Sequence, residues 1–354
     1  MSKLHLIGIF HTKHTDEYSH CAFTGKAKRF PKMMRAQGWD VITYANAGSD
    51  EDVTMLQDSE FDEYFGGYKV TDFFGDRATV GAPGHQAFEK RLISALRDNV
   101  SDHDIICHPF GHAHSRVVSE FPNCYHVETG IGYPTLMDGT FKVFESYAWM
   151  HYHHGKAGRG GKNYEWVVPN YFDLDEWEPS YSSGEYLAFL GRICKVKGMN
   201  TIKAIADHSP YPIVLHGQGD PTPWRHDNIV YKGPISGSAR SDFLRNAVAT
   251  LMPSEFVEPF GGSGVESMLC GTPVLSVNYG AMTETVLENI TGCRCHTLQD
   301  WLDGIETASK MSRYVVAKVS RDRYSLEACG KKYSRIFETI LQLRGKGWYT
   351  LKKC

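Results

Sequence analysis

The stretch that decides the fold of this chain is TLMPSEFVEPFGGSGVESMLCGTPV, residues 250–274. Its apolar start predicts a strand over 249–252, the glycines that follow predict a turn, and a helix is expected to begin near Ser263. Free N–H groups and the helix dipole at such a start favour an anion, for example a diphosphate. Gly261, Gly262 and Ser263 are therefore candidate donor-binding residues.

Two carboxylates flank this helix start. Glu258 lies on the loop before the helix, and Glu266 lies in its first turns. Ionised carboxylates accept hydrogen bonds, which is what vicinal hydroxyls offer, so a loop carboxylate suits a sugar and a helix carboxylate suits a ribose diol. The alternative is that the glycines only permit a tight helix entry and that both carboxylates are solvated.

Outward from this stretch, short apolar runs alternate with helical patterns along the whole chain. The expected strands are 4–10, 41–44, 104–107, 124–127, 186–190, 213–216, 229–231, 249–252 and 273–277. The expected helices are 26–37, 85–97, 199–208, 239–247, 264–270 and 325–343. This alternation predicts parallel sheets covered on both faces, hence an α/β chain of two facing, doubly wound, Rossmann-like domains.

The boundary is expected near Val168–Tyr171, where a proline precedes an acidic stretch with Ser and Gly. We therefore expect an N-terminal acceptor-binding domain over 1–170 and a C-terminal nucleotide-sugar domain over 171–325. Residues 326–354 should form a helix with a basic tail that crosses back onto the N-terminal domain.

Composition fits a two-domain protein of the cytoplasm. The chain has 354 residues and a net charge of −3, from 38 Lys and Arg against 41 Asp and Glu. The nine cysteines include no C-x-x-C pair, which favours free thiols in a reducing compartment over a disulfide framework. No apolar run reaches the length of a membrane helix, and the start of the chain does not read as a signal peptide.

The carboxylate pair, set in EPFG…E…GTPV, resembles the signature of family 4 retaining glycosyltransferases with the GT-B fold, known as glycosyl transferases group 1. Further segments resemble the family in the expected order. They are PNYFD (169–173), FLGR (189–192), KG (197–198), HGQG (216–219) and YKG (231–233). The resemblance covers residues 165–295.

The resemblance implies transfer of a hexose or pentose from a nucleoside diphosphate sugar, UDP- or GDP-linked, to a hydroxyl with retention at the anomeric carbon. Arg192 and Lys197 would hold the donor diphosphate, a pairing that suits phosphate. Glu266 would bind the ribose and Glu258, the catalytic candidate, the donor sugar. The family needs no divalent ion for the donor phosphates, so no cofactor and no essential metal are expected.

The first domain departs further from the family. Only Thr24-Gly25 opens the helix that follows the first strand, which makes Gly25 a donor-side candidate. His108 follows a strand near the place where the family often puts a histidine beside the sugar, so it is a second catalytic candidate. His112 competes for that role and is also an acceptor-side candidate. The alternative is a hydrogen-bonded structural histidine.

Histidine pairs at His112/His114 and at His151/His153 could ligate a metal from a strand, since imidazole suits zinc or iron. No carboxylate or cysteine accompanies them at a ligand spacing, and Cys293-x-Cys295 lacks two further ligands. We therefore predict no metal site.

The acceptor is the least determined partner. Lys26 and Arg29 begin a basic helical face that, with the loop 156–162 and the C-terminal tail, could contact a polyanion. The stretch 18–34 loosely resembles glycosyltransferases of phages and large DNA viruses, so DNA modification at a hydroxymethylated pyrimidine is an option beside a glycan or small molecule. The alternative for the basic residues is that they form an ordinary solvated helix face. The alternatives for the function are a sugar-nucleotide epimerase or hydrolase and a non-catalytic nucleic-acid-binding module.

Overall fold

The computed structural model describes residues 2–18, 21–66, 76–182 and 184–343. The chain divides into two compact units, each built around one parallel sheet. The first unit contains residues 1–145, 150–171 and 326–354, and the second contains residues 146–149 and 172–325. The last segment of the chain thus belongs to the same unit as the first.

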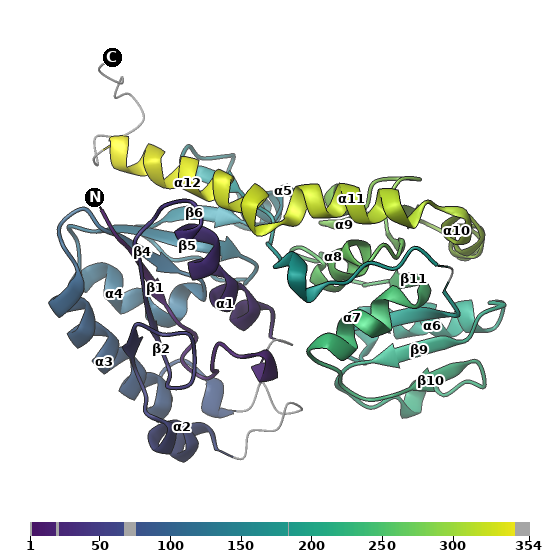
Figure 1. The fold of residues 1–354 in the computed structure, drawn as a ribbon, viewed down its shortest axis with the longest axis horizontal. Coiled ribbons are helices and arrows are strands. Elements are labelled where there is room, and N and C mark those ends of the chain that lie inside the picture. The colour runs from purple at the N-terminus through teal and green to yellow at the C-terminus, as the bar shows by residue number, and fades with distance from the viewer. Residues whose placement is uncertain (1, 19–20, 67–75, 183, 344–354) are drawn as a thin grey trace. The chain divides into compact units, whose positions relative to one another are not determined.

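The first unit is built on a seven-stranded sheet in the order β3-β2-β1-β4-β5-β6-β7 (Figure 1). Its strands are β1 (Leu4–Ile7), β2 (Val41–Ala45), β3 (Val53–Thr54), β4 (Ile105–His108), β5 (Tyr125–Ile131), β6 (Phe141–Phe144) and β7 (Glu165–Val167). Every residue of β1 and β4 is buried, as expected for parallel strands covered on both faces. The strand order reverses between β1 and β4.

Helices cover both faces of this sheet. They are α1 (Ala22–Arg35), α2 (Asp58–Phe65), α3 (Pro83–Asn99), α4 (Ser115–Glu120), α5 (Tyr147–Lys156) and α12 (Leu326–Leu343), with short 3-10 turns η1 (Asp16–Tyr18), η2 (Asp76–Ala78) and η3 (Gly111–His114). Alternate residues of β4 point to opposite faces: Ile105 and Cys107 pack with α1 and α12, whereas Ile106 packs with α3 and α4.

Helix α12, yellow in Figure 1, completes the core of the first unit. Tyr333 and Phe337 are buried on its inner face and contact Phe30 of α1, with ring centroids 5.7 and 6.3 Å apart. Without α12, the face of the first sheet that packs against α1 would therefore be only partly covered.

The second unit has a six-stranded sheet in the order β10-β9-β8-β11-β12-β13. Its strands are β8 (Tyr186–Leu190), β9 (Ile213–His216), β10 (Ile229–Tyr231), β11 (Ala247–Met252), β12 (Val274–Val277) and β13 (Gly292–Cys295). The helical elements are η4 (Leu174–Glu176), η5 (Lys195–Lys197), α6 (Met199–Ala206), η6 (Thr222–Trp224), α7 (Ser238–Arg245), α8 (Gly262–Leu269), α9 (Met282–Thr285), α10 (Leu298–Lys310) and α11 (Arg313–Tyr324). Helices α7, α8 and α11 pack on one face, and α6 and α10 on the other.

The prediction of two doubly wound α/β units is confirmed. Some local predictions were wrong. The first helix begins at Ala22 rather than at residue 26, so Gly25 lies inside it, and β4 extends to include His108. The histidine pairs expected in strands lie instead in η3 and α5. The basic tail after residue 343 lies outside the described residues.

Candidate functional site

The strand order of the second unit reverses between β8 and β11, its two central strands. In open parallel sheets, ligand-binding residues gather outside the carboxyl ends of the strands at such a reversal. The loop after β8 carries Arg192, which is exposed, and Lys197, whereas the loop after β11 carries Glu258. The fold thus brings the predicted cations and carboxylate to one edge of one sheet.

Lys197 and Glu258 form an ion pair at this edge. The Lys197 Nζ lies 2.5 Å from the Glu258 Oε1, and the Ser254 hydroxyl donates to the same oxygen at 2.6 Å. The ammonium also lies 4.7 Å from the centroid of the Phe256 ring. The side chains are 19% and 8% exposed, so the pair is shielded but still reaches the surface.

The loops after β8 and β11 approach each other closely at a glycine in the left-handed backbone conformation. Gly198, directly after Lys197, has φ of 80°, and a Cβ there would lie 1.9 Å from the Pro253 carbonyl oxygen. Beside it, the Glu255 amide donates to the Val196 carbonyl at 2.9 Å. Glycine is therefore required at this position, both for its φ and for its missing side chain.

The start of α8 presents backbone amides at the same edge of the sheet. Gly261 is its N-cap, with φ of 80°, and a Cβ there would lie 2.0 Å from the Met282 methyl carbon. The Gly264 amide donates to the Gly261 carbonyl, so the amides of Gly262 and Ser263 precede the first bond within the helix. The Ser263 hydroxyl donates to the Met252 sulfur at 3.3 Å. This geometry suits an anion.

Glu266 has a partner that sequence reasoning missed. The Glu266 side chain is 9% exposed, and its carboxylate pairs with the Arg240 guanidinium of α7, which also lies 6.0 Å from the centroid of the Trp177 ring. Nothing in the local sequence singles out Arg240, because α7 and α8 meet only in the folded unit. Ser254 was also missed, although its position four residues before Glu258 puts it on the same loop.

The first-unit candidates are placed differently from what the sequence suggests. The Gly25 amide donates to the Cys21 carbonyl at 2.9 Å within α1, so this amide does not face an anion. Lys26 is 3% exposed, and its Nζ donates to the Glu145 carboxylate and, at 2.6 Å, to the Gly130 carbonyl. The expectation that Lys26 lies on a surface helix face was therefore wrong: it is a buried ion-pair residue, and its contact with an acceptor stays a prediction.

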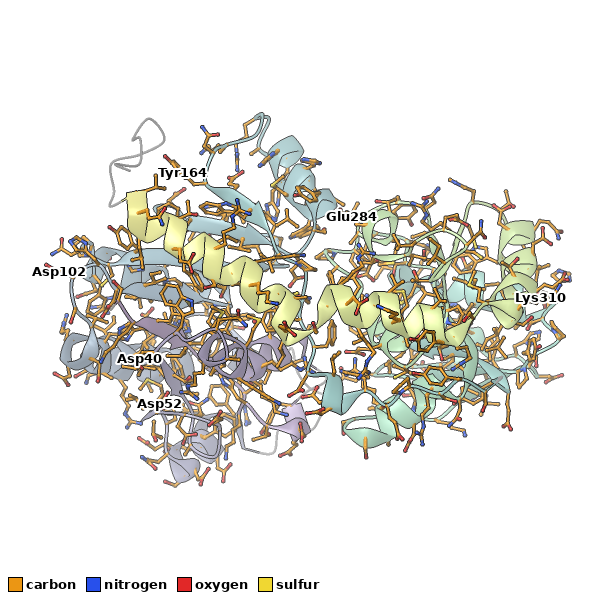
Figure 2. All side chains as sticks on the ribbon, turned by 45° about the horizontal axis from the view of Figure 1, so that its top comes forward. Asp40, Asp52, Asp102, Tyr164, Glu284 and Lys310 are labelled. Atoms are coloured by element: carbon orange, nitrogen blue, oxygen red, sulfur yellow. The ribbon has the colours of Figure 1, made fainter. Side chains whose placement is uncertain are left out.

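The rest of the basic helix face is also largely neutralised. Lys28 pairs with Asp16, and the Arg35 guanidinium donates to Asp52 at 2.7 Å, with Asp52 at the surface in Figure 2. Arg29 is half-buried on α1. Paired cations offer less attraction to a polyanion than the sequence count suggests.

His108 is buried in β4 and bonded to a second histidine. Its Nε2 lies 3.0 Å from the His126 Nδ1, and the His126 Nε2 lies 2.9 Å from the Phe121 carbonyl, to which it must donate. Burial, reinforced by His126 and His114, holds the pKa of His108 well below its usual range. In this arrangement His108 is a hydrogen-bonded interior residue, and its catalytic role stays a prediction.

Around η3, the chain gathers further histidines. His112 is exposed, whereas His11, His14 and His114 are buried. Burial lowers the pKa of His14 to about 4 and is the main cause that lowers the pKa of His114 to about 3. The rings of His14 and His114 are therefore neutral near pH 7.

Residues 174–318, which make up most of the second unit, match the family model described as Glycosyl transferases group 1. The uncharacterized glycosyltransferase MJ1607 of Methanocaldococcus jannaschii is 21% identical over 214 residues, 52% of this chain and 55% of the relative. A D-inositol 3-phosphate glycosyltransferase of Paenarthrobacter aurescens is 32% identical over 82 residues, 23% and 20% of the two chains. The chain thus spans about half or less of these curated relatives.

Solved structures match over nearly the whole chain. AviGT4, a glycosyltransferase involved in avilamycin A biosynthesis, has a TM-score of 0.69 at 17% identity, covering 96% of this chain and 98% of its own. HepE of Anabaena, solved in complex with UDP and glucose, has a TM-score of 0.65 at 12% identity, covering 96% and 100%. The fold is therefore that of GT-B glycosyltransferases: two Rossmann-like units of parallel sheets. In the described parts of the chain, none of the helices is long and apolar enough to cross a membrane.

Proposed function

We propose that the chain is a retaining glycosyltransferase that moves a sugar from a nucleoside diphosphate sugar to a hydroxyl. The observation that carries the proposal is the Lys197–Glu258 ion pair at the strand reversal of the family-matched domain. A cation for a diphosphate and a carboxylate for sugar hydroxyls stand side by side there, next to the amides that open α8.

Each group has a distinct part in this proposal. Lys197, Arg192 and the amides of Gly262 and Ser263 neutralise the leaving diphosphate, which is the main electrostatic demand of the reaction. Glu258 accepts hydrogen bonds from the donor sugar once the diphosphate has drawn Lys197 away. Glu266, oriented by Arg240, accepts hydrogen bonds from the ribose diol. No step requires a divalent ion.

UDP is the first nucleotide to test, because HepE was solved with UDP and glucose. GDP remains the second choice, and retention rests on the resemblance of the Glu258–Glu266 pattern. The free cysteines of the described residues fit the proposed cytoplasmic location.

For the acceptor, we propose a hydroxyl compound of low charge rather than DNA. The burial of Lys26 and the pairing of Lys28 and Arg35 remove much of the basic face that favoured hydroxymethylated DNA and a phage or viral context. A glycan or a small polyol needs no such face. Hydroxymethylated duplex DNA belongs in the test as a separate acceptor.

The test combines binding and product analysis. Calorimetric titration with UDP, GDP and ADP should give saturable binding to at least one nucleotide. Incubation of the matching sugar nucleotide with an acceptor panel, followed by proton NMR, should give an adduct with the donor's anomeric configuration. An altered free sugar without an adduct would favour an epimerase or hydrolase, and DNA binding without nucleotide affinity would refute the proposal.

A further inference from the structure

Three metal-ligand side chains meet in the first unit. His85, Glu89 and His114 each offer one ligand atom, and these atoms lie within 4.8 Å of one another in the described part of the chain. We propose that they bind a divalent transition metal of the zinc class and thereby fasten α3 to the η3 turn.

The helix spacing supplies two of the ligands. His85 and Glu89 are four residues apart on α3, so they lie on one face of the helix. His114 ends η3 and approaches that face from the side, its ring 5.5 Å from that of His85. Tetrahedral zinc with ligands at about 2.1 Å needs ligand atoms about 3.4 Å apart. Metal binding therefore requires side-chain rotations that bring the ligand atoms from within 4.8 Å of one another to that separation.

The hydrogen bonds of His85 fix which of its nitrogens can ligate. Its Nε2 lies 2.5 Å from the Ala113 carbonyl, so this nitrogen carries the proton and donates. The lone pair is then on Nδ1, which accepts from the Gly81 amide at 3.1 Å. Metal-ligating histidines commonly donate their second nitrogen to a carbonyl in this way, and the metal replaces the Gly81 amide.

His114 is the independent sign that the cluster binds something. It is 2% exposed and stacks on Phe88 with centroids 5.3 Å apart, and neither of its ring nitrogens has a hydrogen-bond partner among the described residues. A buried polar group without a partner is costly and calls for an explanation. A metal bound to one of these nitrogens would give it a partner and so remove most of the free-energy cost of burying the ring.

The sequence concealed this site. No carboxylate accompanies His112 and His114 at a ligand spacing in the sequence, which is why no metal site was predicted, and Glu89 comes from another helix. A water molecule completes a four-coordinate shell. The role is structural, and it leaves the metal-independent donor chemistry of the second unit unchanged.

The test uses the full chain purified without a histidine tag and treated with a chelator. Zn²⁺ is titrated in competition with a chromophoric chelator, and Co²⁺ is added separately to record its visible absorption. The variants are Glu89→Gln and His114→Phe. The matched controls are Asp98→Asn, exposed on α3, and His208→Ala, exposed in the second unit.

We expect one Zn²⁺ per chain, a raised thermal midpoint on binding, and Co²⁺ absorption of a four-coordinate site. Loss of a residue that only supports a metal ligand lowers metal affinity by roughly 10- to 100-fold. Each ligand variant should therefore lower the affinity for Zn²⁺ by more than this. The controls should bind as the native chain does. Absence of stoichiometric binding, or native affinity in Glu89→Gln, would overturn the proposal, and Glu89→Gln decides the question even if His114→Phe fails to fold.

Discussion

The Lys197–Glu258 pair allows a test in which two single variants should move nucleotide affinity in opposite directions. In the free protein, Lys197 is bonded to Glu258, whereas a bound diphosphate must take that ammonium as its own partner. The carboxylate therefore competes with the ligand for the cation. Removing the cation should weaken nucleoside diphosphate binding, and neutralising the carboxylate should strengthen it.

The magnitudes follow from the exposure of the pair. A hydrogen bond to a charged group contributes about 1.5–3 kcal/mol, so Lys197→Met should raise the Kd about 10- to 150-fold. The pair to be broken is 19% and 8% exposed and partly screened by solvent. Its loss in Glu258→Gln should stabilise the complex by about 0.5–1 kcal/mol, a two- to fivefold lower Kd. Sugar transfer should be lost in both variants, because Lys197 neutralises the leaving diphosphate and Glu258 binds the donor sugar.

The assay is calorimetric titration with the nucleoside diphosphate that binds best to the native chain. Lys195→Met, exposed on the same turn, and Glu255→Gln, exposed on the same loop, serve as controls and should bind normally. Urea unfolding should show that all four variants keep the fold. If Glu258→Gln weakened binding as much as Lys197→Met does, the pair would be a structural unit and the competition argument would be refuted.

Three further predictions concern other parts of the chain. Gly198→Ala should lower the free energy of unfolding by at least about 2 kcal/mol, because an alanine at φ of 80° costs about 1–2 kcal/mol and its Cβ meets a backbone carbonyl. Gly262→Ala, with open space around it, should change the urea midpoint little, and equal losses in both would contradict the geometry. Arg240→Met should weaken nucleoside diphosphate binding about fivefold but leave pyrophosphate binding unchanged, because Glu266 loses its orienting partner. An equal loss for both ligands would show that Arg240 acts on the phosphates. Since the pKa of His14 falls from 6.5 unfolded to about 4 folded, the unfolded chain takes up the proton first, and about 3 kcal/mol of stability is lost as the pH falls from 6.5 to 4. His14→Gln should reduce, without removing, the pH dependence of the thermal midpoint over that range, because burial also lowers the pKa values of His11 and His114. An unchanged slope would exclude a contribution from His14.

The positions of strands and helices in the second unit could be predicted from the sequence, because they depend on short apolar runs and on the turn residues beside them. The strands at 186–190, 213–216 and 229–231 are apolar runs bounded by turn residues, and the structure has them with the same bounds. The glycines around residue 261 gave the helix start to within one residue. Since a parallel sheet fixes where strand ends meet, these local signals also placed Lys197 and Glu258 at one edge.

Side-chain partners could not be predicted, because they depend on contacts between distant elements. Lys26 sits in a basic run that reads as a surface face, yet Glu145, more than a hundred residues later, draws it into the interior. Arg240 and Glu266 likewise meet only when α7 packs on α8. Short elements such as β13 were missed, since four residues, Gly292–Cys295, are too few for an alternating pattern to stand out.

The return of α12 to the first unit sets the order in which the protein can fold during synthesis. Residues 172–325 can complete their own core as soon as they have left the ribosome, because all but four residues of the second unit lie in that segment. The first unit can complete its core only with the final helix, since Phe30 packs near Tyr171 but gains its contacts with Tyr333 and Phe337 only once α12 is made. A nascent chain stalled before residue 326 therefore exposes an apolar sheet face that a chaperone would have to cover.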